Sequence, residues 1–402
     1  MSVDSKVPEI RFKGFSGAWC QFLLGDLGAV ATNKRIFMHQ ASLIGDVPFY
    51  KIGTFGKEPK LFISQELFDD YKKRFPFPQK GDLLFSVIGS IGRVVEYTGE
   101  NEYFQDSNIV WLKHDGAIVN AFLKQFYSIV KWSGLEGSTI KHLYNRNILE
   151  TKIRLPSVKE QTAIGNYFQK LDSLINQHQQ KHDKLSNIKK AMLEKMFPKQ
   201  GETIPEIRFK GFSGEWEEKE LGSDVADIIG GGTPSTSISE FWDGDIDWYS
   251  PTEIGGNVYA EGSQKKITAL GLKSSSAKIL PAGNTVLFTS RAGIGDMAIL
   301  AKPGATNQGF QSFIVKEGFS PYFIYSAGKQ IKEFALKHAS GSTFLEISGK
   351  QLRRMKILMP SLEEQTAIGN YFQKLDALIN QHQQQITKLN HIKQACLSKM
   401  FV

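Results

Sequence analysis

The sequence predicts an α+β fold arranged as a pseudo-twofold tandem repeat, in which two long antiparallel coiled-coil helices separate two similar α/β domains. Three observations support this fold class. Two segments of the chain occur twice, and the longer of them has the heptad spacing of a coiled coil. The regions between the repeats contain short β-rich runs punctuated by glycine.

The repeated segments border each half of the chain. Val7–Gly17 (VPEIRFKGFSG) returns almost unchanged as Ile204–Gly214, at an offset of 197 residues. Leu155–Phe197 and Met359–Phe401 agree at 31 of 43 positions, at an offset of 204 residues. The region between the repeats is therefore seven residues longer in the second half. Each half consists of a variable module followed by a shared helix.

The start of each shared helix is marked by a capping box. Ser157 with Glu160, and Ser361 with Glu364, have the spacing at which each side chain binds the free backbone N–H of the other. Apolar residues then recur at intervals of three and four, as in a coiled-coil seam. The seam positions are Ile164, Phe168, Leu171, Ile175, His178, His182, Leu185 and Met192, and then Ile368, Phe372, Leu375, Ile379, His382, Ile386, Leu389 and Cys396.

Pro198 is expected to end the first helix, while the second continues to the end of the sequence. A single heptad helix cannot bury its own apolar stripe. The two helices are therefore predicted to pack on each other as a structural strut.

The variable inserts, at about residues 18–136 and 215–340, have the composition of one β-rich fold. Strands are predicted at Asp82–Ile88 and Asn284–Ser290. An amphipathic helix follows in each insert, at Ile118–Trp132 and Pro321–Lys337, and each helix is followed by Gly-Ser-Thr, at Gly137–Thr139 and Gly341–Thr343.

Weak internal matches also indicate a shared fold. DVPFYKIGTF at Asp46–Phe55 parallels DIDWYSPTEI at Asp245–Ile254, and FSVIGSIG parallels FTSRAGIG. The residues that differ are predicted to lie in exposed loops: Val87 and Ile88 stand opposite Ser290 and Arg291. Two modules of one fold with different loop chemistry are suited to binding two different ligands.

Composition narrows the class of protein. The 402 residues are 41% hydrophobic, and no apolar run approaches the ~20 residues that span a bilayer. The N-terminal segment lacks a signal-peptide core, so a cytoplasmic protein without a membrane partner is expected. Cys20 and Cys396 form no CxxC spacing and are expected to be free thiols.

The net charge of +8 favours nucleic acid as a partner, although its distribution weakens that argument. Residues 18–136 carry 13 basic and 13 acidic side chains, and residues 215–340 carry 11 and 15. The positive excess therefore lies in the segments that contain the repeats and the helices.

The sequence has three features that resemble catalytic or metal-binding motifs, and each has a simpler interpretation. There is no P-loop motif, and Gly230–Gly232 is predicted to be a loop that is able to contact a DNA phosphate. His178 and His182 have the spacing of two metal ligands, but the second copy has Ile386 at the position of His182, which favours core packing. The alternating Asp243, Asp245 and Asp247 are predicted to form a solvated turn.

Basic and amide side chains suited to DNA occur in the predicted loops. Arg and Lys read guanine edges, Asn and Gln read adenine, and Lys on phosphate sets the register. The candidates are Lys34, Arg35, Lys72, Lys73, Arg74, Arg93, Lys265, Lys266, Arg291, Asn307, Gln308 and Gln311.

The whole layout resembles the specificity subunits of type I restriction-modification systems. The resemblance rests on the alternation of PEIRFKGFSG, a variable module and EQTAIGNYFQKLD with its helix, and on GGGTPSTS, FTSRAGIGDMAI and TNQGFQSFIV in the second module. It implies target-recognition domains at residues 1–154 and 201–358, with repeated spacer helices at 155–200 and 359–402.

The same resemblance implies DNA-facing residues. In the second module these are Thr233, Pro234, Ser235, Tyr249, Thr252, Ser290, Arg291, Asn307, Gln308 and Gln311. The first module departs from the family pattern, because Ala31–Arg35 replaces the GGTPS loop and Val87-Ile88-Gly89 replaces SRA. Its counterparts are Thr32, Asn33, Lys34, Arg35, Tyr50, Lys51, Ser86, Gly89, Ser90 and Asn108.

The resemblance further implies a non-catalytic subunit that reads an asymmetric bipartite target on double-stranded DNA. Its implied partners are two adenine-N6 methyltransferase (modification) subunits and ATP-dependent restriction/translocase subunits. No cofactor is expected in this chain, since S-adenosylmethionine, ATP and Mg would bind the partner subunits. Two alternatives stay open: a coiled-coil adaptor that binds protein instead of DNA, and a nuclease or transferase centred on Asp243–Glu253.

Overall fold

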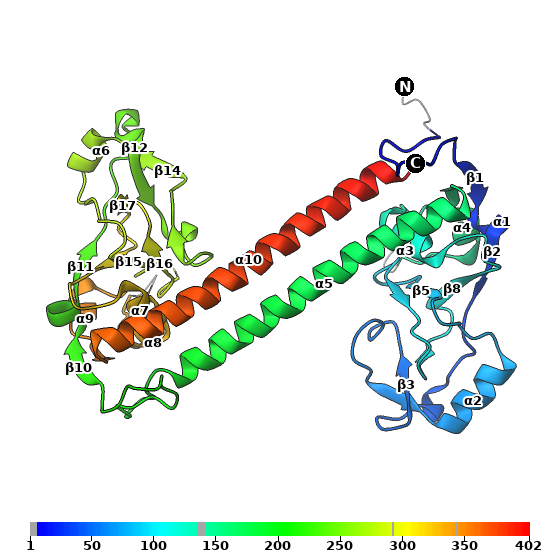
Figure 1. Cartoon of the computed structure of the whole chain (residues 1–402), viewed down its shortest axis with the longest axis horizontal. Helices are drawn as coiled ribbons and strands as arrows, with labels where there is room; N and C mark the ends of the chain where they lie inside the picture. The colour runs from blue at the N-terminus through cyan, green and yellow to red at the C-terminus, as the bar shows by residue number, and fades with distance from the viewer. Residues whose placement is uncertain (1–5, 136–140, 292, 342–344) are drawn as a thin grey trace. The chain divides into compact units, whose positions relative to one another are not determined.

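The computed structural model describes residues 6–135, 141–291, 293–341 and 345–402 (Figure 1). The chain forms two compact units. The first extends to His178 and also includes Gln385–Val402, and the second is Gln179–Gln384. Among the described residues, no helix combines the length and the apolar composition that crossing a membrane requires.

The first unit contains three sheets. Strands β2 (Gly28–Ala31), β8 (Ile109–His114), β5 (Leu83–Ser86) and β6 (Val94–Glu96) form an antiparallel sheet in that order. A second sheet has the order β4 (Leu61–Ile63), β3 (Val47–Tyr50), β7 (Tyr103–Phe104), and β1 (Cys20–Leu23) pairs with β9 (Lys152–Leu155). Its helices are α1 (Leu24–Leu27), η1 (Met38–Gln40), α2 (Gln65–Arg74), α3 (Asn120–Ile129), α4 (Asn145–Leu149) and parts of α5 (Val158–Lys195) and α10 (Leu362–Met400).

The second unit repeats this plan. Its main sheet has the order β11 (Ala226–Gly230), β18 (Gln311–Val315), β15 (Thr285–Phe288), β16 (Met297–Leu300), β13 (Tyr259–Ala260). Its smaller sheet has the order β14 (Lys265–Ile267), β12 (Trp242–Tyr249), β17 (Gly304–Thr306), and β10 (Glu217–Glu220) pairs with β19 (Lys356–Met359). The remaining helices are η2 (Leu221–Val225), η3 (Ser239–Phe241), η4 (Pro251–Glu253), α6 (Ala269–Lys273), α7 (Pro321–Ser326), α8 (Gly328–His338) and α9 (Gly349–Arg353).

Strand order shows that the two modules share one fold, as the internal matches predicted. The sequence β2-β8-β5-β6 corresponds to β11-β18-β15-β16, and β4-β3-β7 corresponds to β14-β12-β17. In both modules the middle strand of the small sheet pairs antiparallel on one side and parallel on the other. Strand β13 extends the main sheet in the second module.

Each main sheet buries both of its faces, because alternate side chains of a strand point to opposite sides. In β5, Phe85 joins a core with Phe122 of α3 and Phe168 of α5, while Leu84 joins the core shared with the small sheet. In β15, Phe288 and Leu287 divide in the same way.

The predicted helices form, with one interruption. The long helices begin at Val158 and Leu362, directly after the predicted caps, and Ile118–Trp132 contains α3. The segment predicted as one helix at Pro321–Lys337 is divided into α7 and α8 at Ala327. Of the two Gly-Ser-Thr segments, Gly137–Thr139 and residues 342–343 lie outside the described residues.

The two long helices run antiparallel within each unit. Lys393 of α10 lies 2.6 Å from Asp172 of α5 in the first unit, and Lys189 of α5 pairs with Asp376 of α10 in the second. The seam prediction was incomplete at the start of each helix, where Ile164 and Phe168 pack into the core of the preceding module. An apolar stripe alone does not specify which apolar surface it meets.

The prediction of a turn at Asp243–Asp247 was wrong, although Asp243 and Asp245 are exposed to solvent as predicted. These residues belong to strand β12, which carries a register shift between Trp242 and Ile246. Asp243 has a positive φ of 58°, a conformation in which aspartate is found more often than most residues. Asp247 is buried and accepts hydrogen bonds from the backbone N–H and the hydroxyl of Ser263.

Candidate nucleic-acid interface

In the second module, the structure brings together the four segments that the sequence marked as DNA-facing. Backbone hydrogen bonds join them: Asn307 N–H to the Tyr249 carbonyl (3.0 Å), and Ser290 N–H to the Gly309 carbonyl (2.8 Å). A third bond runs from Gly232 N–H to Thr306 (2.8 Å). The segments therefore form one loop cluster, and its shape is set by backbone contacts.

The glycine run of this cluster is explained by close packing. A Cβ atom on Gly231 would lie 2.0 Å from the carbonyl oxygen of Asn307, and one on Gly232 would lie 2.5 Å from the backbone nitrogen of Ala277. Only glycine fits at these positions without backbone movement. The predicted loop is confirmed at Gly231 and Gly232, where glycine allows the close packing, whereas Gly230 is the last residue of β11.

Four candidate side chains of the second module are exposed. Thr233 donates a hydrogen bond to the side-chain oxygen of Gln308, and the Ser235 hydroxyl lies 2.9 Å from that of Ser237. The Thr252 hydroxyl lies 3.0 Å from that of Ser250. These groups present hydroxyls and an amide to solvent, which is chemistry suited to base edges and phosphates.

Other candidates of the second module are less accessible. Pro234, Tyr249 and Ser290 are buried, and Arg291, Asn307 and Gln311 are half-buried, with Asn307 accepting a hydrogen bond from Gly309 N–H. Burial raises the pKa of Tyr249 to about 12. In the part of the chain that the structure describes, neither the Tyr249 hydroxyl nor the Ser290 hydroxyl has a hydrogen-bond partner.

The first module joins its loops with equivalent bonds. Gln105 N–H donates to the Tyr50 carbonyl (2.8 Å), and Val87 N–H donates to the Asn108 carbonyl (3.0 Å). These bonds match the ones made by Asn307 and Ser290 in the second module. Val87 is therefore the structural counterpart of Ser290, as predicted. The prediction that these two side chains are exposed was wrong, because both are buried where the loops are joined.

Ser86 then corresponds to Thr289, and both hydroxyls hold a turn. The Ser86 hydroxyl donates to the Ser90 carbonyl and accepts from Arg93 N–H (3.1 Å). The Thr289 hydroxyl donates to the Gly293 carbonyl (2.6 Å) and accepts from Asp296 N–H (2.9 Å). Ser86 is buried and committed to these bonds, whereas Gly89, with a positive φ of 67°, and Ser90 are exposed at the tip of the turn.

The loop after β2 carries four further candidates. The Thr32 hydroxyl donates to the Ile109 carbonyl (3.1 Å), and exposed Arg35 pairs with Asp106 (2.8 Å). The Lys34 carbonyl accepts a hydrogen bond from the Tyr103 hydroxyl (2.8 Å). Between these anchored residues, Asn33 is 3% exposed, and neither atom of its amide has a partner among the described residues.

The two remaining candidates of the first module lie on and just after β3. The Tyr50 hydroxyl donates to Glu102 (3.3 Å), and burial raises the pKa of Tyr50 to about 12. Lys51 is half-buried with its ammonium 3.7 Å from the sulfur of Met38. Tyr50 therefore directs its hydroxyl to an acidic neighbour.

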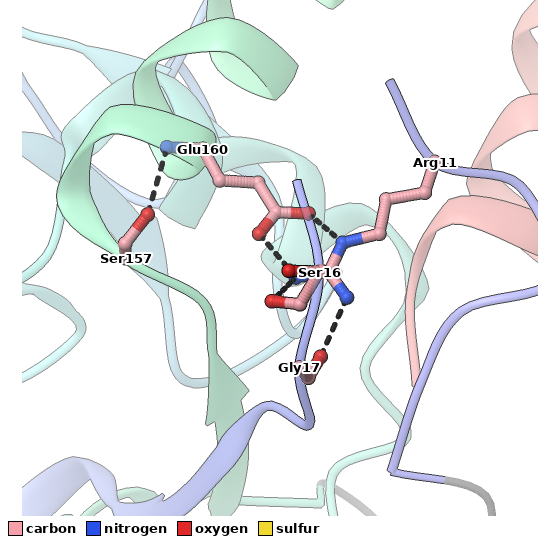
Figure 2. A network of polar contacts seen from close by, with 5 residues as sticks. All are labelled: Arg11, Ser16, Gly17, Ser157 and Glu160. Carbon is pink, nitrogen blue, oxygen red and sulfur yellow. Dashed lines mark hydrogen bonds and ion pairs between the residues drawn. The ribbon is translucent and has the colours of Figure 1, made fainter. Parts of the chain in front are cut away.

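An ion pair that was not predicted from the sequence joins the repeated segment Val7–Gly17, here called the arm, to the first turn of α5. Figure 2 shows Arg11 between Glu160 and the carbonyls of Ser16 and Gly17. Both guanidinium–carboxylate bonds are 2.7 Å long, and these hydrogen bonds to Glu160 raise the pKa of Arg11. One half of the predicted capping box forms, since the Glu160 backbone N–H donates to the Ser157 hydroxyl at 3.4 Å. In the other half, the Glu160 carboxylate was expected to accept from the Ser157 backbone N–H, but it binds Arg11 instead.

The second copy has the same arrangement. Arg208 binds Glu364 with two bonds of 2.6 Å and donates to the Gly214 carbonyl (2.5 Å). Both glutamates are 1% exposed. The signal in the sequence was the pairing itself, since each copy keeps an arginine in the arm and a glutamate in the first turn of the helix.

The residues considered above for metal binding and catalysis form hydrogen bonds and ion pairs within the protein. His182 lies 3.0 Å from Asp183, and no group of three or more His, Cys, Asp or Glu side chains among the described residues is arranged to hold a metal ion. Near Asp243–Glu253, the Glu253 carboxylate accepts from Ser250 and from Gln264 N–H.

The sequence matches the family described as "Type I restriction modification DNA specificity domain" twice, at residues 17–187 and 213–391. The chain belongs to this family. Each match covers one module together with most of the helix that follows it. The family assignment therefore applies to both halves of the tandem repeat.

Curated relatives agree with this assignment. A Haemophilus influenzae protein that carries the name of a type I restriction enzyme specificity subunit is 51% identical over 154 residues, or 38% of this chain and 40% of that protein. The type I restriction enzyme MjaIX specificity subunit of Methanocaldococcus jannaschii is 35% identical over 192 residues, or 47% of this chain and 44% of that subunit. The matched region therefore covers less than half the length of each of these relatives.

A solved structure supports the fold over the whole chain. The S subunit of a type I restriction-modification system from M. genitalium superposes with a TM-score of 0.62, covering 98% of this chain and 99% of that chain. The sequence identity is 16%, so this likeness concerns the fold alone.

Proposed function

We propose that the chain is the sequence-specific DNA-binding specificity subunit of a type I restriction-modification complex. One observation carries the proposal: two modules of one fold join their loops with the same backbone bonds but present different side chains. In the loop after β2 the first module exposes Lys34 and Arg35, whereas the matching loop of the second module exposes Thr233 and Ser235. Different side chains on equal frames read different sequences, so the target is asymmetric.

The target is also bipartite, with an unread spacer between two half-sites. Helices of this length extend about 60 Å at ~1.5 Å per residue. Half-sites one or more turns of duplex apart, at ~3.4 Å per base pair, fall within that reach. The helices then serve as a ruler for the spacer.

The repeated flanks suit two copies of one partner. Duplicated arms and helices offer two equivalent surfaces, on which two methyltransferase subunits dock. Methylation and cleavage belong to those subunits and to ATP-dependent restriction subunits, which bind S-adenosylmethionine, ATP and Mg. This chain supplies recognition, and Asp247 and Glu253 in the suspected enzyme site serve as structural acceptors.

A base-resolution map of N6-methyladenine in the source cell, with and without this chain, tests the proposal. Loss of methylation at one split, asymmetric motif upon deletion is the expected result. An unchanged map, together with no sequence-specific duplex binding when methyltransferase subunits are added, would support the protein-binding adaptor instead.

A second experiment tests the ruler. Deleting one heptad from each long helix is expected to shorten the spacer of the methylated motif or to abolish methylation. The matched control deletes a heptad from one helix only, which breaks the antiparallel pairing. Methylation with an unchanged spacer after the double deletion would contradict the ruler.

A further inference from the structure

Five exposed cationic side chains lie beside the first module's loop cluster. Lys34 and Arg35 belong to the loop after β2, and Lys72, Lys73 and Arg74 form the last turn of α2. The Lys34 ammonium lies 5.0 Å from the centre of the Phe75 ring, and the Arg74 guanidinium lies 5.3 Å from the same ring. One ring therefore holds cations from two segments that are distant in the sequence; these five side chains are called the α2 basic surface.

Most of this charge has no acidic partner. Arg35 and Arg74 pair with Asp106 and Asp70, each at 2.8 Å. Over residues 6–135, 141–291, 293–341 and 345–402, no carboxylate lies within 4 Å of the ammonium groups of Lys34, Lys72 and Lys73. The surface keeps a net charge of three positive side chains.

Aromatic rings hold these cations in place without neutralising them. The Lys72 ammonium lies 5.0 Å from the Phe68 ring and 5.3 Å from the Phe77 ring. Such contacts fix the aliphatic stem while the charge stays available to an anion. A cation that is already positioned loses less conformational freedom when it binds.

The helix dipole accounts for only part of the arrangement. Basic residues are favoured in the last turn of a helix, which explains Lys72, Lys73 and Arg74. It does not explain why Lys34 comes from another segment to the same ring, because like charges at close range repel. An anionic partner resolves that repulsion.

We infer that the α2 basic surface binds backbone phosphates of duplex DNA beside the first half-site; this rests on the proposed function. Lys34 directly follows Asn33 in the loop cluster, and the Thr32 hydroxyl of the same loop accepts from Ser107 N–H (3.1 Å). DNA against that cluster passes next to α2. With about 3.4 Å of rise per phosphate on each strand, the surface meets about two or three phosphates.

At the matching place, directly after β14, the second module has the short helix α6, whose last turn carries a single basic residue, Lys273. Two further lysines lie on β14 itself. Lys265 lies 5.8 Å from the Trp242 ring, whose N–H donates to the Ser235 carbonyl, while Lys266 lies 3.7 Å from Asp247. One side of its cation pair is thus neutralised by a buried carboxylate. The first module therefore provides the stronger phosphate contact of the two.

The test measures how the affinity of the full chain for a duplex of unrelated sequence depends on salt. The variant is Lys72→Gln with Lys73→Gln. Its matched control is Lys113→Gln with Lys152→Gln, two exposed lysines on β8 and β9. Strand β8 begins at Ile109, next to the loop cluster, and Lys113 lies near its other end. Lys113 is therefore distant from the loop cluster along the strand.

Each lost phosphate contact reduces the steepness of the plot of log affinity against log salt by about 0.9. The slope of the double variant is therefore expected to be less steep by about 2, and the slope of the control is expected to be unchanged. Equal slopes in all three proteins, or no binding by the unaltered chain at low salt, would overturn the inference. A protein partner lost from the variant with an unchanged slope would instead assign the surface to an acidic protein. The methylation map tests the proposed function separately. If the map shows a split motif but the salt slopes of the variant and the unaltered chain are equal, only the role of the α2 basic surface is rejected.

Discussion

The side chains of the first and second modules differ most in the loop cluster, where the backbone hydrogen bonds of the two modules are equivalent. In both modules, the residue that follows the last strand of the small sheet donates its backbone N–H to a tyrosine carbonyl: Gln105 to Tyr50 in one and Asn307 to Tyr249 in the other. Yet the Tyr50 hydroxyl binds Glu102, whereas the Tyr249 hydroxyl is buried without a partner among the described residues. Backbone bonds set the cluster, and side chains are free to vary on it. A module of this kind can therefore change the side chains of its loops without changing its fold.

The largest effect is expected where a helix end enters a module core. Phe197 is 6% exposed and packs against Trp216 and Phe323, at ring distances of 5.9 Å and 5.2 Å. Its counterpart Phe401 is half-buried and packs against Phe122 at 5.0 Å. Phe197→Ala is expected to destabilise the second unit by about 4 kcal/mol, and Phe401→Ala the first unit by about 2 kcal/mol.

Hydrogen exchange resolved to each unit measures both values. Exposed Phe37 provides the control, since Phe37→Ala is expected to change stability by less than about 0.5 kcal/mol. If each substitution weakens both units equally, the units unfold together and the comparison between them fails.

The next effect comes from the arm and helix ion pairs, where the two halves should behave alike. Arg11→Met leaves Glu160 buried without its partner, and Arg208→Met does the same to Glu364. Each is expected to cost about 3 kcal/mol. Adding Glu160→Gln or Glu364→Gln is expected to restore part of the loss, measured by the same exchange experiment. If the two substitutions lowered the free energy of unfolding by different amounts, the two ion pairs would differ in energy despite their equivalent geometry.

A smaller effect separates the half-sites. Gln308→Ala or Arg291→Ala is expected to relax recognition of the second half-site only, and Ser90→Ala, at the exposed tip of its turn, of the first only. Each is expected to lose about 1–3 kcal/mol of discrimination, the value of a good base contact. Binding to duplexes with single base changes in either half measures it. Equal weakening of both halves by one substitution would contradict modular reading.

The smallest predicted effect reverses sign between the modules. Tyr249→Phe removes a buried hydroxyl that has no partner, so stability is expected to rise by up to about 1 kcal/mol. Tyr50→Phe removes the donor to Glu102, whose pKa burial already raises, so stability is expected to fall by about 1 kcal/mol. Denaturant unfolding of the two variants against the unaltered chain measures both. Changes of the same sign would show that the two tyrosines are not in contrasting environments.

The sequence predicted the architecture because repeats and periodicity are local signals. The helix starts at Val158 and Leu362 and the matching strands at Leu83–Ser86 and Thr285–Phe288 follow from caps, spacing and composition. The DNA-contact roles of the loop residues stay predictions.

What the sequence could not predict depends on contacts between distant segments. Ser86 belonged to the same string as Gly89 and Ser90, yet its hydroxyl holds the turn from inside. Glu160 fitted a capping box, but Arg11, far away in the chain, takes its carboxylate. Asp247 looked exposed because alternating aspartates are common in turns, and only the placement of Ser263 shows it as a buried acceptor.

The core of the first unit includes Leu397 and Met400, from the last turn of α10, beside Trp19 and Phe122. The second unit, by contrast, is the continuous segment Gln179–Gln384. A ribosome therefore makes every residue of the second unit before it completes the first, although the first is begun earlier. Until the final turn of α10 emerges, the first unit keeps an open apolar site. A chain that ends before residue 397 therefore leaves Trp19 and Phe122 without the contacts that Leu397 and Met400 supply.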